Sequence, residues 1–289
     1  MPFSRRLRWA GILLGGVAAL AMVVGVIGWL VGRAKLTRAY DPPAGLTSVP
    51  RDSATLAEGE HLVRIYGCRG CHGENLGGGI VADVPPGRFV ASNLTRGRGG
   101  VGTMYQIADW DHAIRSGLRP DHTPLIPVMP YRVLGHLGDA DAAALIAYVQ
   151  QVPAVDNSLP SSTVRLPGYL LVAVANRESL FGRHTRPPVE APAQGTAAYG
   201  AYLVATICSD CHGERLQGGQ YPEPGSPPGP PLSAAAFWSE ADLATALRTG
   251  VAPGGRHLSE WMPVWRLQYL TDSEIHSLYL FLPTVRTPH

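Results

Sequence analysis

Two short stretches of the sequence hold side chains that could do chemistry together. "CRGCH" occupies residues 68–72 and "CSDCH" occupies residues 208–212, and together they contain all four cysteines of the chain. No cysteine therefore remains for a separate disulfide framework or a lone nucleophile. The pattern C-x-x-C-H is compatible with a zinc site, a redox-active dithiol, a disulfide or the attachment of haem c.

The spacing favours haem attachment over the other three chemistries. A structural zinc ion needs four nitrogen or sulfur ligands, which neither stretch supplies by itself. A thioredoxin-like dithiol is expected in a βαβ setting, and no strand pattern flanks either stretch. In haem attachment the thiols form thioethers with the porphyrin and the adjacent histidine binds the iron. The sequence thus predicts two covalently attached haem c groups, bound by Cys68, Cys71, Cys208 and Cys211, with axial nitrogens from His72 and His212.

An internal repeat indicates the second axial ligand of each iron. The segment "VMPYRVLGHLGDAD" (128–141) recurs as "WMPVWRLQYLTDSE" (261–274), so Met129 and Met262 occupy the same position, each before a proline. A thioether is a soft donor that favours Fe(II) and raises the reduction potential. The alternative role is core packing, but repetition at matched positions favours ligation. Met104 has no methionine counterpart and is expected to pack.

The remaining polar groups are not expected to react. The other histidines have no histidine counterpart in the second copy, which favours surface or packing roles. Asp109, Asp111, Asp139 and Asp141 stand at expected helix starts, where capping explains them. With both axial positions filled, no open iron site is left, so we predict an electron-transfer protein without catalytic residues. The alternative is a dihaem redox enzyme, of peroxidase or thiosulfate-oxidising type, which needs one iron free or switchable.

The N-terminal region is expected to cross a membrane. Residues 9–31 contain no charge and are numerous enough to span a bilayer as a helix, with Trp9 and Trp29 near the two ends. The alternative is a cleaved signal peptide, whose apolar region is usually shorter. Arginines and lysine flank both ends, so charge barely decides the orientation. Because haem c is attached outside the cytoplasmic membrane, we predict a single-pass inner-membrane anchor with the haem regions on the periplasmic side.

Length and patterning predict an all-α protein with two similar helical modules. A length of 289 residues suits about two domains, and a net charge of +2 without a basic run argues against nucleic acid as a partner. A helix expected over 168–181 would pack between the modules. The predicted organisation is a cytoplasmic tail (1–8), transmembrane anchor (9–31), tether (32–51), first module (52–152), proline-rich linker (153–195) and second module (196–286).

The sequence resembles the class I c-type cytochrome modules of membrane-bound dehydrogenase cytochrome subunits, such as those serving alcohol and gluconate dehydrogenases. The resemblance rests on "GEHLVRIYGCRGCHG", "SNLTRGRGGVG", "HAIRSGLRPD", "PVMPY" and "LGDADAAALIAYV", and covers about residues 52–285. It implies that both modules are cytochrome c domains, each a small helical bundle around its haem. Asn93 matches a position that contacts a haem propionate or stabilises the haem loop, whereas the second copy has Pro231 there.

The resemblance also carries expectations about function. Together with the two C-x-x-C-H stretches and the N-terminal span, it leads us to expect a membrane-anchored dihaem cytochrome c that carries single electrons between a membrane or periplasmic donor and an acceptor of a respiratory or photosynthetic chain. The expected partners are a dehydrogenase, a quinol-oxidising complex or an oxidase, within a larger complex. This sequence departs from the family pattern, which usually has three haem modules and a C-terminal anchor.

Overall fold

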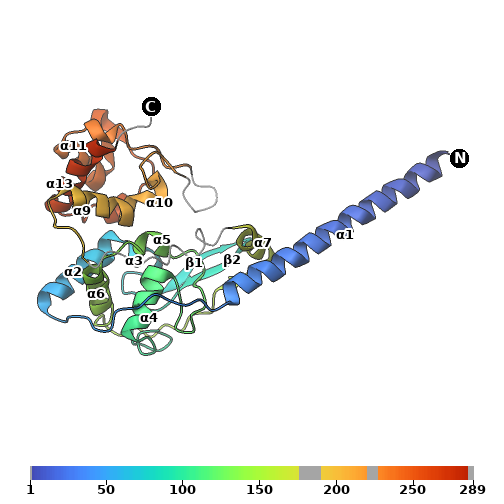
Figure 1. Ribbon diagram of the computed structural model, residues 1–289, viewed down its shortest axis with the longest axis horizontal. Coiled ribbons are helices and arrows are strands. Elements are labelled where there is room, and N and C mark those ends of the chain that lie inside the picture. Colours follow the sequence, from blue (N-terminus) through green and yellow to red (C-terminus); the bar gives the residue numbers. More distant parts are fainter. Residues whose placement is uncertain (1, 176–189, 220–226, 286–289) are drawn as a thin grey trace.

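The computed structural model describes residues 2–175, 190–219 and 227–285. Figure 1 shows two lobes and one long projecting helix. The lower lobe in that view contains the helices between residues 53 and 149, and the upper lobe contains those between 197 and 281. Their buried apolar side chains belong to one continuous cluster that includes Leu62 from the lower lobe and Leu203 from the upper lobe. The lobes are therefore packed against each other as well as joined by the chain.

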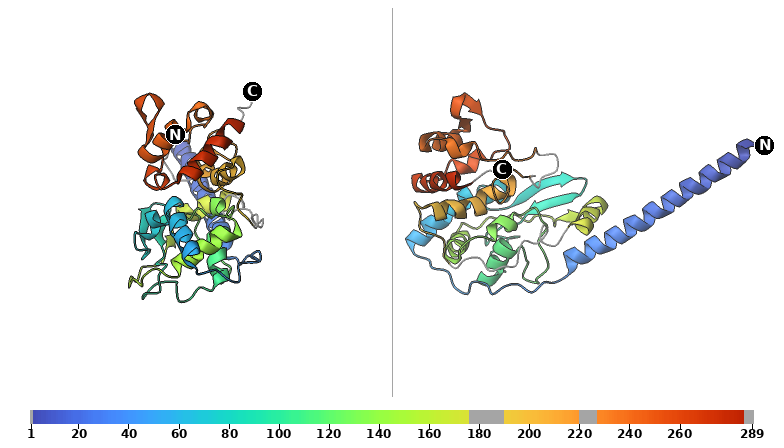
Figure 2. Two further views of the ribbon diagram at one scale, coloured as in Figure 1. Left: turned by 90° about the vertical axis from the view of Figure 1, so that its left-hand side faces the viewer. Right: turned by 45° about the horizontal axis from the view of Figure 1, so that its top comes forward.

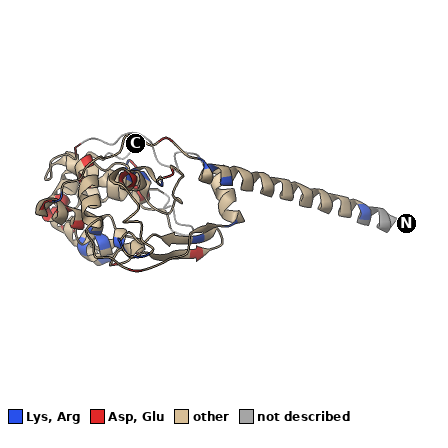
Figure 3. Ribbon diagram, turned by 90° about the horizontal axis from the view of Figure 1, so that it is seen from below, with Lys and Arg blue, Asp and Glu red and all other residues tan. Residues whose placement is uncertain are grey.

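The projecting element is helix α1 (Pro2–Thr37). From Arg8 to Thr37 it is long and apolar enough to cross a membrane, and its most apolar window is not covered by the rest of the described chain. Figures 2 and 3 show it extending away from both lobes, with basic residues near its two ends. The helix continues beyond residue 31, where the sequence analysis ended the span, because Ala34, Lys35 and Leu36 are good helix formers.

The lower lobe is built mainly from short helices whose ends are capped. Asp52 caps the helix that precedes the first C-x-x-C-H stretch by accepting hydrogen bonds from the N–H groups of Ala54 and Thr55. Gly117 ends a later helical segment with a left-handed backbone (φ 65°). The elements are α2 (Ser53–Ile65), α3 (Cys68–His72), β1 (Gly79–Val84), β2 (Gly87–Ala91), α4 (Ile107–Asp111), the π-helical turn η1 (His112–Ser116), α5 (Tyr131–Leu134), α6 (Asp139–Val149), β3 (Thr163–Val164) and α7 (Leu166–Val174).

The lower lobe also contains a small sheet, which corrects the expectation of an all-α fold. Strands β1, β2 and β3 form an antiparallel sheet in that order, with Gly79 paired to Ala91 and Gly87 paired to Val164. No strand pattern is evident beside the first C-x-x-C-H stretch because the region is rich in glycine. The valine, isoleucine and phenylalanine residues of the hairpin suit a strand, and Pro85–Pro86 provides the turn.

The upper lobe repeats the helical plan of the lower lobe. It contains α9 (Ala197–Leu203), the π-helical turn η2 (Val204–Cys208), α10 (Ser209–His212), η3 (Ala235–Phe237), α11 (Glu240–Thr249), β4 (Val251–Ala252), η4 (Pro253–Gly255), β5 (Arg256–His257), α12 (Val264–Leu267), α13 (Asp272–Phe281) and η5 (Leu282–Thr284). Helix α2 crosses α6 in the lower lobe, and α9 crosses α13 in the upper lobe. Both crossings are close because a glycine lies at the contact: a Cβ on Gly59 would collide with the carbonyl of Ala144, and one on Gly200 with that of Ser277.

Helix α7 does not lie between the lobes, which corrects the expectation for the 168–181 segment. It packs instead on the last turns of α1, where Gly28 and Gly32 allow Leu170 and Tyr169 to approach closely. Residues 176–181 of the expected helix lie outside the described residues. No local sequence pattern predicts this contact, because it joins two segments that are far apart in the chain.

Candidate functional site

The first C-x-x-C-H stretch forms a single helical turn, α3, that aims its histidine at a fixed hydrogen-bond partner. The helix starts after Gly67, which has a left-handed backbone (φ 73°), and the turn places Cys68 and Cys71 on one face. The Nδ1 atom of His72 lies 2.8 Å from the carbonyl oxygen of Ser92. Because a carbonyl can only accept, Nδ1 donates and the lone pair is on Nε2, the atom free to bind iron. Burial lowers the pKa of His72, which keeps the ring neutral.

The second stretch has the same arrangement. The Nδ1 atom of His212 lies 2.7 Å from the carbonyl oxygen of Pro230, which occupies the position of Ser92 in the repeat. Burial lowers the pKa of His212 as well. The loops that supply these carbonyls are fixed alike: Leu94 donates its N–H to the carbonyl of Leu76, and Leu232 donates its N–H to the carbonyl of Leu216, both at 2.9 Å. Both histidines are thus held in the tautomer that an axial ligand needs.

Three of the four cysteine thiols are in surroundings that keep them protonated. Burial raises the pKa of Cys68 to about 11, that of Cys208 to about 12 and that of Cys211 to about 11, although the nearby positive charge of Arg266 opposes each increase. Redox-active dithiols and zinc-binding cysteines have lowered pKa values instead. Within the described ranges, no group of three or more His, Cys, Asp or Glu side chains is arranged to hold a metal ion.

A cavity of about 460 Å³ joins the first stretch to its predicted second ligand. Cys68, Cys71 and His72 line it from α3, and Met129 lines it from the loop before α5. The rest of the lining is mostly apolar and includes Phe89 from the hairpin, with further residues from helices α4 and α6 and from the linker. The volume is in the range of cofactor pockets. The donor set, the neutral histidine and the apolar walls therefore fit a haem c.

The other predicted site residues are placed as follows. Met262 is half-buried against the core in the loop before α12, the position equivalent to that of Met129. Met104 is 63% exposed and does not line the cavity, so the expected packing role is wrong. Asn93 lines the cavity, but its side chain is buried and bonded within the loop, donating to the carbonyl of Val155 (2.7 Å) and accepting from Thr95 N–H (2.9 Å). These contacts match the loop-stabilising role, and its propionate contact stays a prediction.

The two C-x-x-C-H helices meet residues from the opposite lobe, which the sequence analysis did not foresee. Arg132 of α5 binds Asp210 of the second stretch, with Nη2 and Oδ1 2.7 Å apart. Trp265 of α12 occupies the position of Arg132 in the repeat, and its ring lies against Gly70, the counterpart of Asp210. Each lobe thus uses the same short helix, after its Met-Pro pair, to touch the attachment helix of the other.

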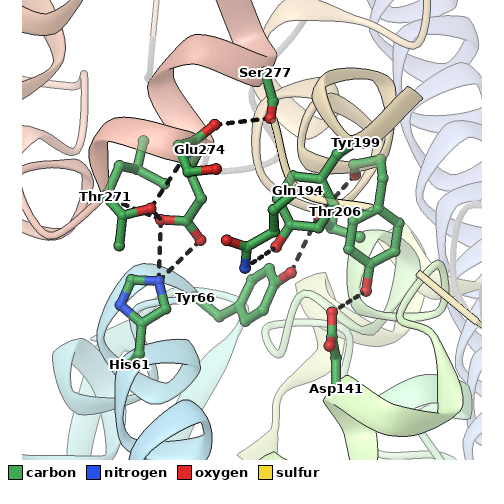
Figure 4. A network of polar contacts seen from close by, with 12 residues as sticks. His61, Tyr66, Asp141, Gln194, Tyr199, Thr206, Thr271, Glu274 and Ser277 are labelled. Carbon is green, nitrogen blue, oxygen red and sulfur yellow. Dashed lines mark hydrogen bonds and ion pairs between the residues drawn. The ribbon is translucent and has the colours of Figure 1, made fainter. Parts of the chain in front are cut away.

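A second pair of reciprocal contacts flanks these helices. His61 Nε2 lies 2.9 Å from Glu274 Oε1 (Figure 4), and this hydrogen bond raises the pKa of His61. Tyr202, the counterpart of His61, donates to Asp141 Oδ2 at 2.5 Å, and Asp141 is the counterpart of Glu274. Burial raises the pKa of Asp141, which the hydrogen bond from Tyr202 opposes. The interface therefore contains charged or polar pairs that are equivalent in the repeat.

The fold and site fit one class of protein: those whose C-x-x-C-H helices carry c-type haem. In line with this, residues 195–282 match the family model described as cytochrome C oxidase, cbb3-type, subunit III. The matched segment contains the whole second stretch and Met262, and it corresponds to the upper lobe.

Comparisons with individual proteins extend the similarity to both lobes. The chain is 26% identical over 268 residues to the fructose dehydrogenase cytochrome subunit of Gluconobacter japonicus, covering 84% of this chain and 55% of the relative. It is 28% identical over 267 residues to the alcohol dehydrogenase (quinone) cytochrome c subunit of Komagataeibacter europaeus, covering 81% and 56%. It is 29% identical over 265 residues to a diheme cytochrome c-type protein of Cereibacter sphaeroides, covering 81% and 84%.

These similarities confirm the resemblance to cytochrome c subunits, which are electron-transfer components. The chain spans about half the length of the dehydrogenase subunits that it matches. It spans most of the diheme protein, which carries two haems by its name.

Proposed function

We propose that this protein is a membrane-anchored dihaem cytochrome c that carries single electrons between a membrane or periplasmic donor and an acceptor of a respiratory or photosynthetic chain. Two cytochrome c domains, residues 52–152 and 196–286, each hold one haem c. The first haem is bound by Cys68 and Cys71 with His72 and Met129 as axial ligands, and the second by Cys208 and Cys211 with His212 and Met262.

The observation that carries this proposal is the cavity shared by α3 and Met129. A covalent attachment helix and a soft sulfur donor, 57 or more residues apart in the chain, line the same apolar space. A bound haem c supplies a reversible one-electron couple at its iron. The chain contributes the axial ligands on both sides, which favours low-spin iron without an open position and so favours electron transfer over catalysis.

The contacts between the lobes support a direct route from one site to the other. Arg266 lies close enough to lower the pKa of thiols in both stretches, those of Cys68 and Cys208, so the two attachment helices are near each other. Its Nη1 atom also donates to the carbonyl of Ile65 at 3.3 Å. Trp265 and Arg132 fix the same interface from its two sides. Electrons entering at one haem would then leave at the other without a mobile carrier between them.

The location and partners form the second part of the proposal. Helix α1 would cross the inner membrane and place both domains on the periplasmic side, where haem c is attached. The names of the relatives support membership in a dehydrogenase complex, with the dehydrogenase as electron donor and the chain as its cytochrome subunit. Purification from membranes, with identification of the proteins that accompany the chain, tests this part.

Haem content and spin state test the central proposal. The purified full chain should contain two haem c groups, both low-spin, and the oxidised protein should show the weak absorption band of a thioether–iron bond. One haem per chain, or a high-spin iron that turns over peroxide, would refute the dihaem electron carrier and favour the enzyme alternative.

A further inference from the structure

Helix α7 presents an apolar surface that no other described element covers. Its nine residues, "LPGYLLVAV", include no charge. Gly168 and Val172 are buried against neighbouring elements. On the other side Leu166 is 51% exposed, Leu171 55% and Val174 84%, which is unusual for three large apolar residues on one short helix.

Three features hold α7 to the end of the apolar stretch of α1. Gly28 and Gly32 of α1 leave room for Leu170 and for the backbone of Tyr169. The Nζ atom of Lys35 donates to the carbonyls of Val172 (3.2 Å), Ala173 (2.8 Å) and Ala175 (2.9 Å). A cation on the last carbonyls of a helix is favourable because these groups lack partners within the helix. Helix α7 is therefore fixed beside the final turns of α1.

The β1–β2 hairpin continues this surface. Arg165, which precedes α7, binds Asp83 through Nη2 at 2.6 Å and donates its backbone N–H to the carbonyl of Pro86 at 2.9 Å. Val84, next to the turn, is 40% exposed. The hairpin turn, α7 and the end of α1 thus lie together on one side of the lower lobe, as Figure 1 shows.

We propose that the face formed by Leu166, Leu171 and Val174 inserts into the interfacial layer of the same bilayer that α1 crosses. This inference rests on the proposed role of α1 as membrane anchor. Lipid is the occupant because α7, which carries this face, packs on the apolar part of α1 at Gly28 and Gly32. Arg33 and Arg38 follow the apolar part of α1 in the chain and supply positive charge that suits anionic headgroups. Because α1 already holds α7 beside the bilayer, the short length of α7 does not prevent it from binding there.

Insertion of α7 would fix the height and tilt of the lower lobe above the membrane. A single spanning helix leaves the attached domain free to swivel. Contact of a second element with the bilayer, at a point displaced from α1, removes that freedom. The first haem cavity, which belongs to this lobe, would then keep a constant distance from the membrane surface and from any donor within it.

Site-specific photocrosslinking in native membranes tests this inference on the full chain. The photoreactive residue p-benzoylphenylalanine replaces Val174, Leu171, Leu14 in the middle of α1, or Phe237, which is 90% exposed on the upper lobe. Radiolabelled phospholipid reports lipid adducts, and gel shifts report protein adducts. We expect lipid adducts at Leu14, Leu171 and Val174, several-fold above those at Phe237.

The four crosslinker positions distinguish the outcomes that would contradict the inference. Lipid adducts at Leu14 with none above the Phe237 control at Leu171 and Val174 would overturn the inference while the anchor stands. Protein adducts at Leu171 and Val174 would overturn it in favour of a protein partner. An absence of lipid adducts at Leu14 would refute the anchor itself and the inference with it.

Discussion

Tyr66 donates a hydrogen bond to Thr206, with 3.3 Å between the two oxygens, and each of the two residues stands two positions before the first cysteine of its C-x-x-C-H stretch (Figure 4). They are 140 positions apart, as are the paired cysteines Cys68 and Cys208. Equivalent residues can touch each other only at an approximate two-fold axis. The reciprocal pairs His61–Glu274 and Tyr202–Asp141 then fall on opposite sides of that axis.

Replacing either predicted methionine ligand should change one haem and leave the other. Met129→Ala or Met262→Ala removes the thioether that favours Fe(II), so the potential of that haem should fall by on the order of 0.1 V, within the roughly 0.8 V range that axial ligands control. The haem stays attached, because its thioether bonds are untouched. Redox titration followed by visible spectroscopy measures this.

The matched control is Met104→Ala, which removes an exposed methionine that does not line the cavity. Both potentials should be unchanged in this variant. If Met129→Ala or Met262→Ala also leaves both potentials unchanged, the ligand assignment is wrong.

The contact between His61 and Glu274 should make the stability of the protein depend on pH. Folding raises the pKa of His61, so its contribution is complete below the ordinary value of about 6.5 and is lost as the pH rises through the raised value. His61→Gln should therefore lower the free energy of unfolding by about 2 kcal/mol at pH 6 and by progressively less at higher pH. Denaturant titrations between roughly pH 6 and pH 9 measure this difference.

His276→Gln serves as the control, since the pair His276–Glu240 lies at the surface with both side chains more than 40% exposed. It should cost less than about 0.5 kcal/mol at any pH. A penalty for His61→Gln that is constant across the pH range would contradict the charged contact.

The contact between Gly70 and Trp265 should be sensitive to one added methyl group. A Cβ on Gly70 would lie 2.6 Å from Cη2 of the Trp265 ring. Gly70→Ala should therefore lower stability by about 1–2 kcal/mol, the usual effect of overpacking. Gly79→Ala is the control, because a Cβ there has no neighbour within 4 Å.

A double-mutant cycle distinguishes this collision from a local effect on α3. In a Trp265→Ala background the ring is absent, so Gly70→Ala should cost markedly less. An equal penalty in both backgrounds would show that the ring does not constrain Gly70. Thermal unfolding gives all four free energies.

Lys35 should hold α7 in place. Lys35→Gln removes the charge that binds three carbonyls at the end of α7, so amide hydrogen exchange over residues 168–175 should become faster. Arg33→Gln, two residues earlier on the same helix, is the control because Arg33 lies over the Trp29 ring instead. Equal exchange in the two variants would contradict the capping role of Lys35.

The sequence predicts most of the local structure and much less of the packing. Helix ends at Asp52 and Gly117 are readable because a cap acts within a few residues. The repeat predicts Met129 as a ligand because Met262 occupies the matching position, and this prediction needs no information about the cavity. The hairpin was missed because its glycines resemble those of an irregular loop, and its strands are defined by pairing. The contacts of Trp265 with Gly70 and of α7 with α1 join residues more than 130 positions apart, which no local pattern encodes.

The contact of Tyr66 with Thr206 joins two similar lobes that belong to the same polypeptide. Two separate copies of such a lobe, meeting through the same face, would form an isologous dimer that falls apart on dilution. Here both copies belong to one polypeptide, so the second lobe is present at a high effective concentration however scarce the protein is. The spacing between the two haem sites is then independent of expression level.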